Sequence, residues 1–82
     1  MSFILTIVTP TGKFFEGEAL SLDAPGEIGP LTILTDHAPI VAGLKKGKLT
    51  VTPKSRQDKL TLDITGGVLE VDPQHQAVVL VS

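Results

Sequence analysis

Apolar and polar residues alternate with a period of two along most of this chain, which is the spacing of a β-strand. Residues 48–52 and 60–65 alternate most clearly, so each would place one face on a core and the other in water. Residues 3–8 and 77–81 are apolar on both faces, and we expect the first of these runs to be a central strand. No segment of ten residues has the spacing of an amphipathic helix.

Proline and glycine divide the chain between these runs. Residues 10–12 and 72–75 predict turns, and residues 25–30, which contain two prolines and two glycines, predict a loop. Gly17 predicts a bulge or bend that splits residues 13–24 into two strands.

The middle of the chain predicts short extended pieces. Residues 31–34 predict a short strand, and residues 37–42 predict a second piece that Pro39 confines to the edge of a sheet. Gly43 and Gly47 predict the ends of a turn that carries lysines.

Two further interruptions complete the pattern. Residues 53–59 are polar and predict a hairpin loop, and Gly66 and Gly67 predict a tight turn or bulge. The result is about eight to ten short, mainly antiparallel strands in one domain over residues 1–82. We therefore expect an all-β fold, either a flattened β-sandwich or a barrel.

Composition limits the residue types that can form the core and the classes of partner that the chain can bind. The 82 residues include no Trp, no Tyr and three Phe, so the core must be built from Val, Leu and Ile. The net charge is −2, and the basic residues Lys45, Lys46 and Lys48 have no aromatic neighbours, so we expect no nucleic-acid binding. No run approaches the roughly 20 apolar residues of a membrane-spanning helix, and the N-terminus lacks the positive charge of a signal peptide.

Candidate catalytic chemistry is scarce. The chain has no cysteine, and its two histidines are His37 and His75, whereas a zinc site needs about three or four ligands. No serine lies in the glycine-flanked motif of a hydrolase nucleophile. We expect no catalytic residue, no metal, no cofactor and no small-molecule ligand.

Apolar residues beside the proline- and glycine-rich loop are the more informative feature. Ile28, Leu31, Ala38 and Ile40 look exposed in the predicted elements, and apolar residues that gather on one surface favour a protein–protein interface. The alternative is that these side chains fold back onto the core.

Several motifs occur in an order that resembles one known family. They occupy residues 9–12, 15–19, 25–31, 35–40, 44–49 and 66–71, and include Asp-His-Ala-Pro-Ile and Gly-Gly-Val-Leu-Glu-Val. In this order they resemble the N-terminal β-sandwich domain of the epsilon subunit of the F-type rotary ATP synthase, called delta in mitochondria. The resemblance covers essentially all 82 residues.

This resemblance implies a non-catalytic rotor subunit of the central stalk, which couples ion-driven rotation to ATP synthesis at the cytoplasmic face of a bacterial inner membrane or its organelle equivalent. Its partners would be the gamma subunit and the c-ring, and contact with the membrane would be made only through the complex. The residues implied to bind gamma are His37, Ala38, Pro39 and Ile40. The loop implied to face the c-ring comprises Pro25, Gly26, Glu27, Ile28, Gly29, Pro30 and Leu31.

Most members of the family continue past the sandwich into two helices, which can restrain ATP hydrolysis and in some members bind ATP. The present sequence ends at Ser82, so the resemblance carries over neither an inhibitory helix nor a nucleotide site. The other interpretation is a small β-sandwich module that binds an unrelated protein.

Overall fold

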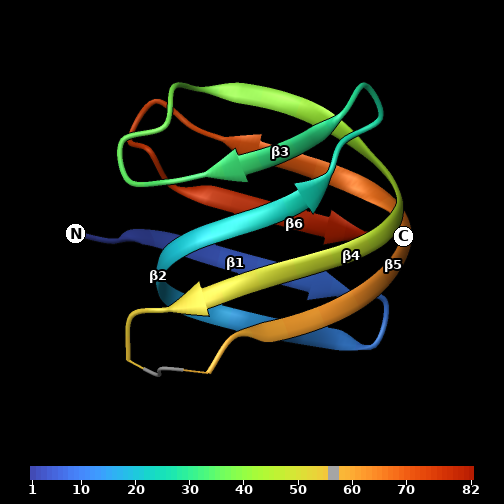
Figure 1. The fold of residues 1–82 in the computed structure, drawn as a ribbon, viewed down its shortest axis with the longest axis horizontal. Coiled ribbons are helices and arrows are strands. Elements are labelled where there is room, and N and C mark those ends of the chain that lie inside the picture. The colour runs from blue at the N-terminus through green and yellow to red at the C-terminus, as the bar shows by residue number, and fades with distance from the viewer. Residues whose placement is uncertain (56–57) are drawn as a thin grey trace.

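The computed structural model describes residues 1–55 and 58–82, and in these residues six β-strands form one closed sheet (Figure 1). The strands are β1 (Phe3–Thr9), β2 (Gly12–Pro25), β3 (Pro30–Ile33), β4 (Ile40–Pro53), β5 (Leu60–Val71) and β6 (Ala77–Val81). Their order is β1-β6-β5-β4-β2-β3, and an additional pairing of β1 with β2 closes the ring. The pair β1–β6 is parallel and the other pairs are antiparallel. No helix in the described part of the chain is long and apolar enough to cross a membrane.

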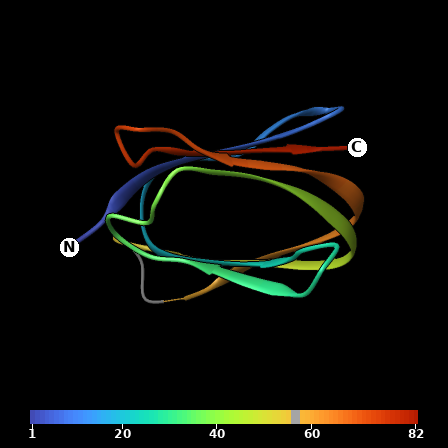
Figure 2. The ribbon, with the colours of Figure 1, turned by 90° about the horizontal axis from the view of Figure 1, so that it is seen from above.

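The sheet is folded into two layers that face each other (Figure 2). Strands β4 and β5 bend from one layer into the other at one side of the molecule, and β2 does so at the opposite side. Each of these strands therefore contributes to both layers and takes the place of two short strands. The all-β class is confirmed. The structure has six strands, and because three of them contribute to both layers, this number is close to the eight to ten short strands expected.

Three predicted interruptions are wrong for this reason. Gly43 and Gly47 do not bound a turn, because β4 pairs with β5 without a change of register on either side of the lysines. Gly66 and Gly67 lie inside β5 and not in a turn. Gly17 pairs with Leu5 and does not divide β2, whose register shifts occur on either side of it.

Other predictions from the sequence are confirmed. Strand β1 is central, because it pairs with both β2 and β6. Residues 10–11 turn the chain between β1 and β2, and a turn after Val71 leads from β5 to β6. The predicted hairpin loop at residues 53–59 joins β4 to β5, although Arg56 and Gln57 lie outside the described residues.

The core between the layers is aliphatic, as the composition predicts. In residues 1–55 and 58–82 no buried side chain is polar or charged, so the contacts between the facing layers are apolar. The largest fully buried side chains are those of Leu5, Ile7, Leu22, Ile33, Leu49, Leu69, Val51, Val79 and Pro53.

The two adjacent glycines of β5 give a matched test of this packing. A Cβ atom on Gly67 would lie 2.5 Å from the carbonyl oxygen of Leu80, whereas one on Gly66 would meet nothing closer than 3.5 Å. We expect Gly67→Ala to lower the free energy of unfolding by about 1–3 kcal/mol, because the backbone of β6 must shift. Gly66→Ala should change it by about 0.5 kcal/mol or less. Urea denaturation of both variants measures the difference, and equal effects would contradict the close approach of β6.

Candidate protein-binding surface

The loop between β2 and β3 is tied to the first half of β4. Glu27 donates its backbone N–H to the carbonyl oxygen of Gly43 at 2.9 Å, and Gly26 forms an isolated β-bridge with Leu44. Gly26 is buried, and a Cβ atom there would clash with the carbonyl oxygen of Gly29, so the loop requires glycine at this position. Ile28 is fully exposed at the tip.

The segment at residues 37–39 leads directly into β4. His37 donates its backbone N–H to the carbonyl oxygen of Leu34 at 3.2 Å, and its ring Nδ1 lies 2.7 Å from the carbonyl oxygen of Ala38. Ala38 and Pro39 are exposed, and Ile40 begins the strand.

The loop lies beside β4, whereas residues 37–39 lie at the other end of β3 (Figure 1). A hollow of about 370 Å³ separates the loop from the start of β4, and its lining is largely apolar. The residues that line it are Gly26, Glu27, Ile28, Gly29, Pro30, Leu31, Val41, Ala42 and Gly43. This hollow joins the loop to residues 41–43, which follow Ile40 in β4.

The exposed apolar candidates divide into two groups. Ile28 and Ala38 are exposed, as expected. Leu31 and Ile40 are partly buried and pack against the core, so for these two the alternative that they fold back is the better description.

A larger apolar surface lies on the outside of β4, β5 and β6, and sequence reasoning missed it. Val68 lies opposite Leu80, and Val41 and Val78 both lie opposite Glu70. Residues that are directly opposite in antiparallel strands share a face of the sheet, so Val68 is next to Leu80, and the exposed Glu70 lies between Val41 and Val78. The exposed fractions are 74% for Val41, 44% for Val68, 36% for Val78 and 55% for Leu80. We call these four residues the outer apolar face.

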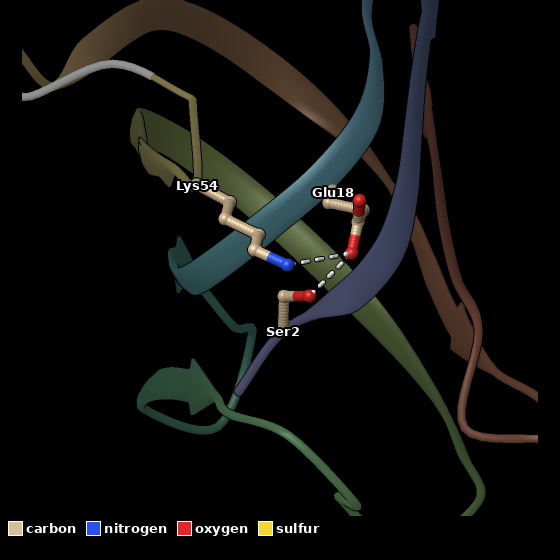
Figure 3. Close-up of polar contacts among 3 residues, drawn as sticks. All are labelled: Ser2, Glu18 and Lys54. Carbon is tan, nitrogen blue, oxygen red and sulfur yellow. Dashed lines mark hydrogen bonds and ion pairs between the residues drawn. The ribbon is translucent and has the colours of Figure 1, made fainter.

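Polar groups gather elsewhere, at the start of β1. The Glu18 carboxylate accepts a hydrogen bond of 2.6 Å from the Ser2 hydroxyl and forms a 3.5 Å ion pair with Lys54 (Figure 3). The hydrogen bond from Ser2, followed by the charge of Lys54, lowers the pKa of Glu18 below its ordinary value. All three side chains are open to solvent, so this cluster has the features of a surface network and not of a catalytic site.

The histidines are both used in hydrogen bonds to the backbone. His75, in the turn between β5 and β6, places Nδ1 2.9 Å from the carbonyl oxygen of His37. In the described parts of the chain, no three His, Cys, Asp or Glu side chains come together to hold a metal ion.

The whole sandwich, with its loop and its outer face, matches one family model. Residues 2–82 match the model of the ATP synthase delta/epsilon chain β-sandwich domain. The chain belongs to this family.

Similar proteins agree with this assignment. The chain is 43% identical over 74 residues to the ATP synthase epsilon chain of Xanthomonas campestris pv. campestris strain B100, and the match covers 90% of this chain and 52% of that protein. It is 44% identical over 70 residues to the epsilon chain of Chlorobaculum tepidum, with 85% and 78% covered. The chain thus spans about half the length of the Xanthomonas relative.

The fold also recurs in solved structures. A chain of the Euglena gracilis mitochondrial ATP synthase superposes with a TM-score of 0.87 over 98% of this chain and 50% of that chain, at 20% identity. A chain from the central stalk and c-ring of the Tetrahymena thermophila mitochondrial enzyme gives 0.85, at 18% identity. At these identities the likeness shows the fold of the delta/epsilon sandwich and not its contacts.

The polar cluster at Glu18 makes a prediction about pH. We expect Ser2→Ala to raise the pKa of Glu18 toward its ordinary value, because it removes the largest single cause of the lowering. A depressed pKa stabilises the fold above the pKa of the unfolded chain, and this stabilisation is lost as pH falls through the folded pKa. Carboxyl carbon NMR during a pH titration measures the shift. Lys54→Gln, which removes the positive charge, should also raise the pKa, and an unchanged pKa in Ser2→Ala would contradict the role of the Ser2 hydrogen bond.

Proposed function

We propose that residues 1–82 form one β-sandwich domain of a non-catalytic rotor subunit in the central stalk of a rotary F-type ATP synthase. In this role it binds the gamma subunit and the c-ring and helps to couple ion-driven rotation to ATP synthesis. It reaches the membrane peripherally, through the complex, on the cytoplasmic face of a bacterial inner membrane or its organelle equivalent. Family membership supports this role, and so do the names of the epsilon-chain relatives.

The observation that carries the proposal is the outer apolar face. Exposed valines and a leucine on three adjacent strands are unfavourable in water, and such a patch is typical of a protein–protein interface. Val41 of this face directly follows residues 37–40, which the family resemblance assigns to gamma. We therefore place gamma on this face and on His37, Ala38, Pro39 and Ile40.

The loop at residues 25–31 would face the c-ring. Its tip presents the fully exposed Ile28, and its base is tied to β4 by the backbone hydrogen bond from Glu27 to Gly43. Strand β4 thus carries both proposed contacts. A force applied at the loop would reach the gamma-binding face through a packed sheet, which deforms little.

The decisive experiment is co-elution of this chain with a purified alpha–beta–gamma ATPase core in size-exclusion chromatography, with ATP hydrolysis measured in the same samples. Stable co-elution is the expected result, and failure of the folded chain to co-elute would contradict the proposal. Hydrolysis that is unchanged in the complex would describe a coupling subunit without inhibitory action.

The outer apolar face predicts the effect of one substitution. We expect Val41→Asp to weaken binding to the gamma-containing core by about 2 kcal/mol, roughly 30-fold in Kd, because a carboxylate would be buried at the centre of the contact. Isothermal titration calorimetry measures the change. Val41 is chosen in place of its neighbour Ile40, which packs partly on the core, so that the core is left intact. The aspartate would face Glu70 across the ladder, so urea denaturation measures separately any loss of stability from this like-charge pair. Thr61→Asp, which adds the same charge at an exposed position of β5, should bind as the wild type does. An equal loss of affinity in Val41→Asp and Thr61→Asp would show that the outer apolar face does not contact gamma.

The loop predicts the complementary result. We expect Ile28→Asp to reduce association with a detergent-solubilised complex of the c-ring and gamma by about tenfold, because its side chain is fully exposed and would be buried only by the ring. The same variant should bind the ring-free gamma core normally. Pull-down with both preparations measures the two affinities. Loss of binding to the ring-free core would show that the loop contacts gamma instead.

A further inference from the structure

Two non-glycine residues of the described chain have a positive φ, and they lie in two different loops. Asp36, with a φ of 65°, directly precedes the segment proposed to bind gamma, and His75, with a φ of 64°, lies in the turn between β5 and β6. A residue with a Cβ atom adopts this backbone conformation at an energetic cost, and such positions cluster where a precise shape is needed. The hydrogen bond between the His75 ring and the His37 backbone joins these two loops.

The chemistry of this contact determines the state of the His75 ring. A carbonyl oxygen can only accept a hydrogen bond, so Nδ1 of His75 must carry a proton and donate it to His37. Strand β4 begins at Ile40, so the carbonyl group of His37 lies outside the ladder between β4 and β5. The imidazole therefore supplies a hydrogen bond that the sheet does not.

The turn that carries His75 is itself held by hydrogen bonds. The Asp72 carboxylate accepts the backbone N–H groups of Gln74 and Gln76, both at 2.9 Å. The Asp72 backbone is bonded to Gln76 and His75, also at 2.9 Å. The turn begins one residue after Val71, which is the partner of Ile40 in the ladder. This register brings the turn beside residues 37–39, so a fixed turn aims the imidazole at the segment as it leaves the sheet.

We propose that His75 is a positioning residue that holds residues 37–39 in the shape that the gamma subunit recognises. The inference rests on the proposed function, because gamma is the partner for which the segment is held. Ordering a loop on association reduces the affinity, and a segment that is already held avoids that loss. His75 thus contributes to binding through His37 and needs no contact of its own with gamma.

Two substitutions separate the hydrogen bond from the backbone conformation. Asparagine and glycine both tolerate a positive φ at position 75. The side-chain amide of asparagine can donate from the place of Nδ1, whereas glycine has no donor. His75→Asn is therefore the matched control for His75→Gly.

The experiment measures two quantities on wild type and both variants. The first is the affinity for the alpha–beta–gamma core, and the second is amide hydrogen exchange at His37, Ala38, Ile40 and Val41 in the free chain. We expect His75→Gly to weaken binding by about three- to tenfold, the value of one hydrogen bond, and to speed exchange at these amides by a similar factor. His75→Asn should remain within about twofold of wild type in both. Exchange at the core residue Leu69 should be unchanged in all three proteins.

Other results would overturn the inference. Wild-type affinity in His75→Gly, or the same loss in His75→Asn as in His75→Gly, would show that the hydrogen bond does not position the segment. If the wild type fails to bind the core, the proposed function fails and the role toward gamma fails with it. If wild type binds and the variants do not differ, only the inference fails. Nitrogen NMR of the wild-type ring needs no variant, and a His75 ring protonated on Nε2 alone would also overturn it.

Discussion

The continuity of three strands through both layers is the constraint on which the rest of the structure depends. Strands β2, β4 and β5 each contribute to both faces of a small core, so strands that run from one layer into the other join the layers at both sides. An 82-residue chain buries a modest share of its surface, about 60% for a domain of this size, and it has little apolar packing to spare. Covalent continuity across the bends supplies the connection that a larger core would supply in a bigger protein.

Closure of the sheet separates the apolar residues that face the core from those that are exposed on the outside. The inner faces of the strands hold large aliphatic side chains, such as Leu5, Leu49 and Val79, with no exposure to water. The alternate residues of β5 and β6 point outward, and at Val68 and Leu80 these too are apolar. Folding alone does not require them, since a polar residue there would leave the core intact. A partner that covers this face is the simplest physical reason for them.

Sequence reasoning recovered the fold class and much of the arrangement, because alternation with a period of two survives in any register. It failed at Gly43, Gly47, Gly66 and Gly67, where the local rule that glycine marks a turn was overridden by pairing between strands far apart in the sequence. It also missed Val78 and Leu80, because a run that is apolar on both faces does not reveal which residues point inward. For the same reason the sequence does not show which of Ile40 and Val41 points outward, since a shift of one residue exchanges the two faces.

The loops follow a different rule from the strands. A strand is held by its neighbours in the ladder, but residues 37–39 connect two layers and have a geometry that no ladder dictates. Their shape depends on individual hydrogen bonds, such as those from the rings of His37 and His75, and on the positive φ of Asp36. Such bonds are few and each is modest, so a single side chain can decide whether the segment is ordered before a partner arrives. If the subunit transmits force between two partners, a binding segment that is flexible would deform before it transmits that force. On this argument, the segment proposed to bind gamma is best placed where it lies, next to a turn that is itself fixed by Asp72.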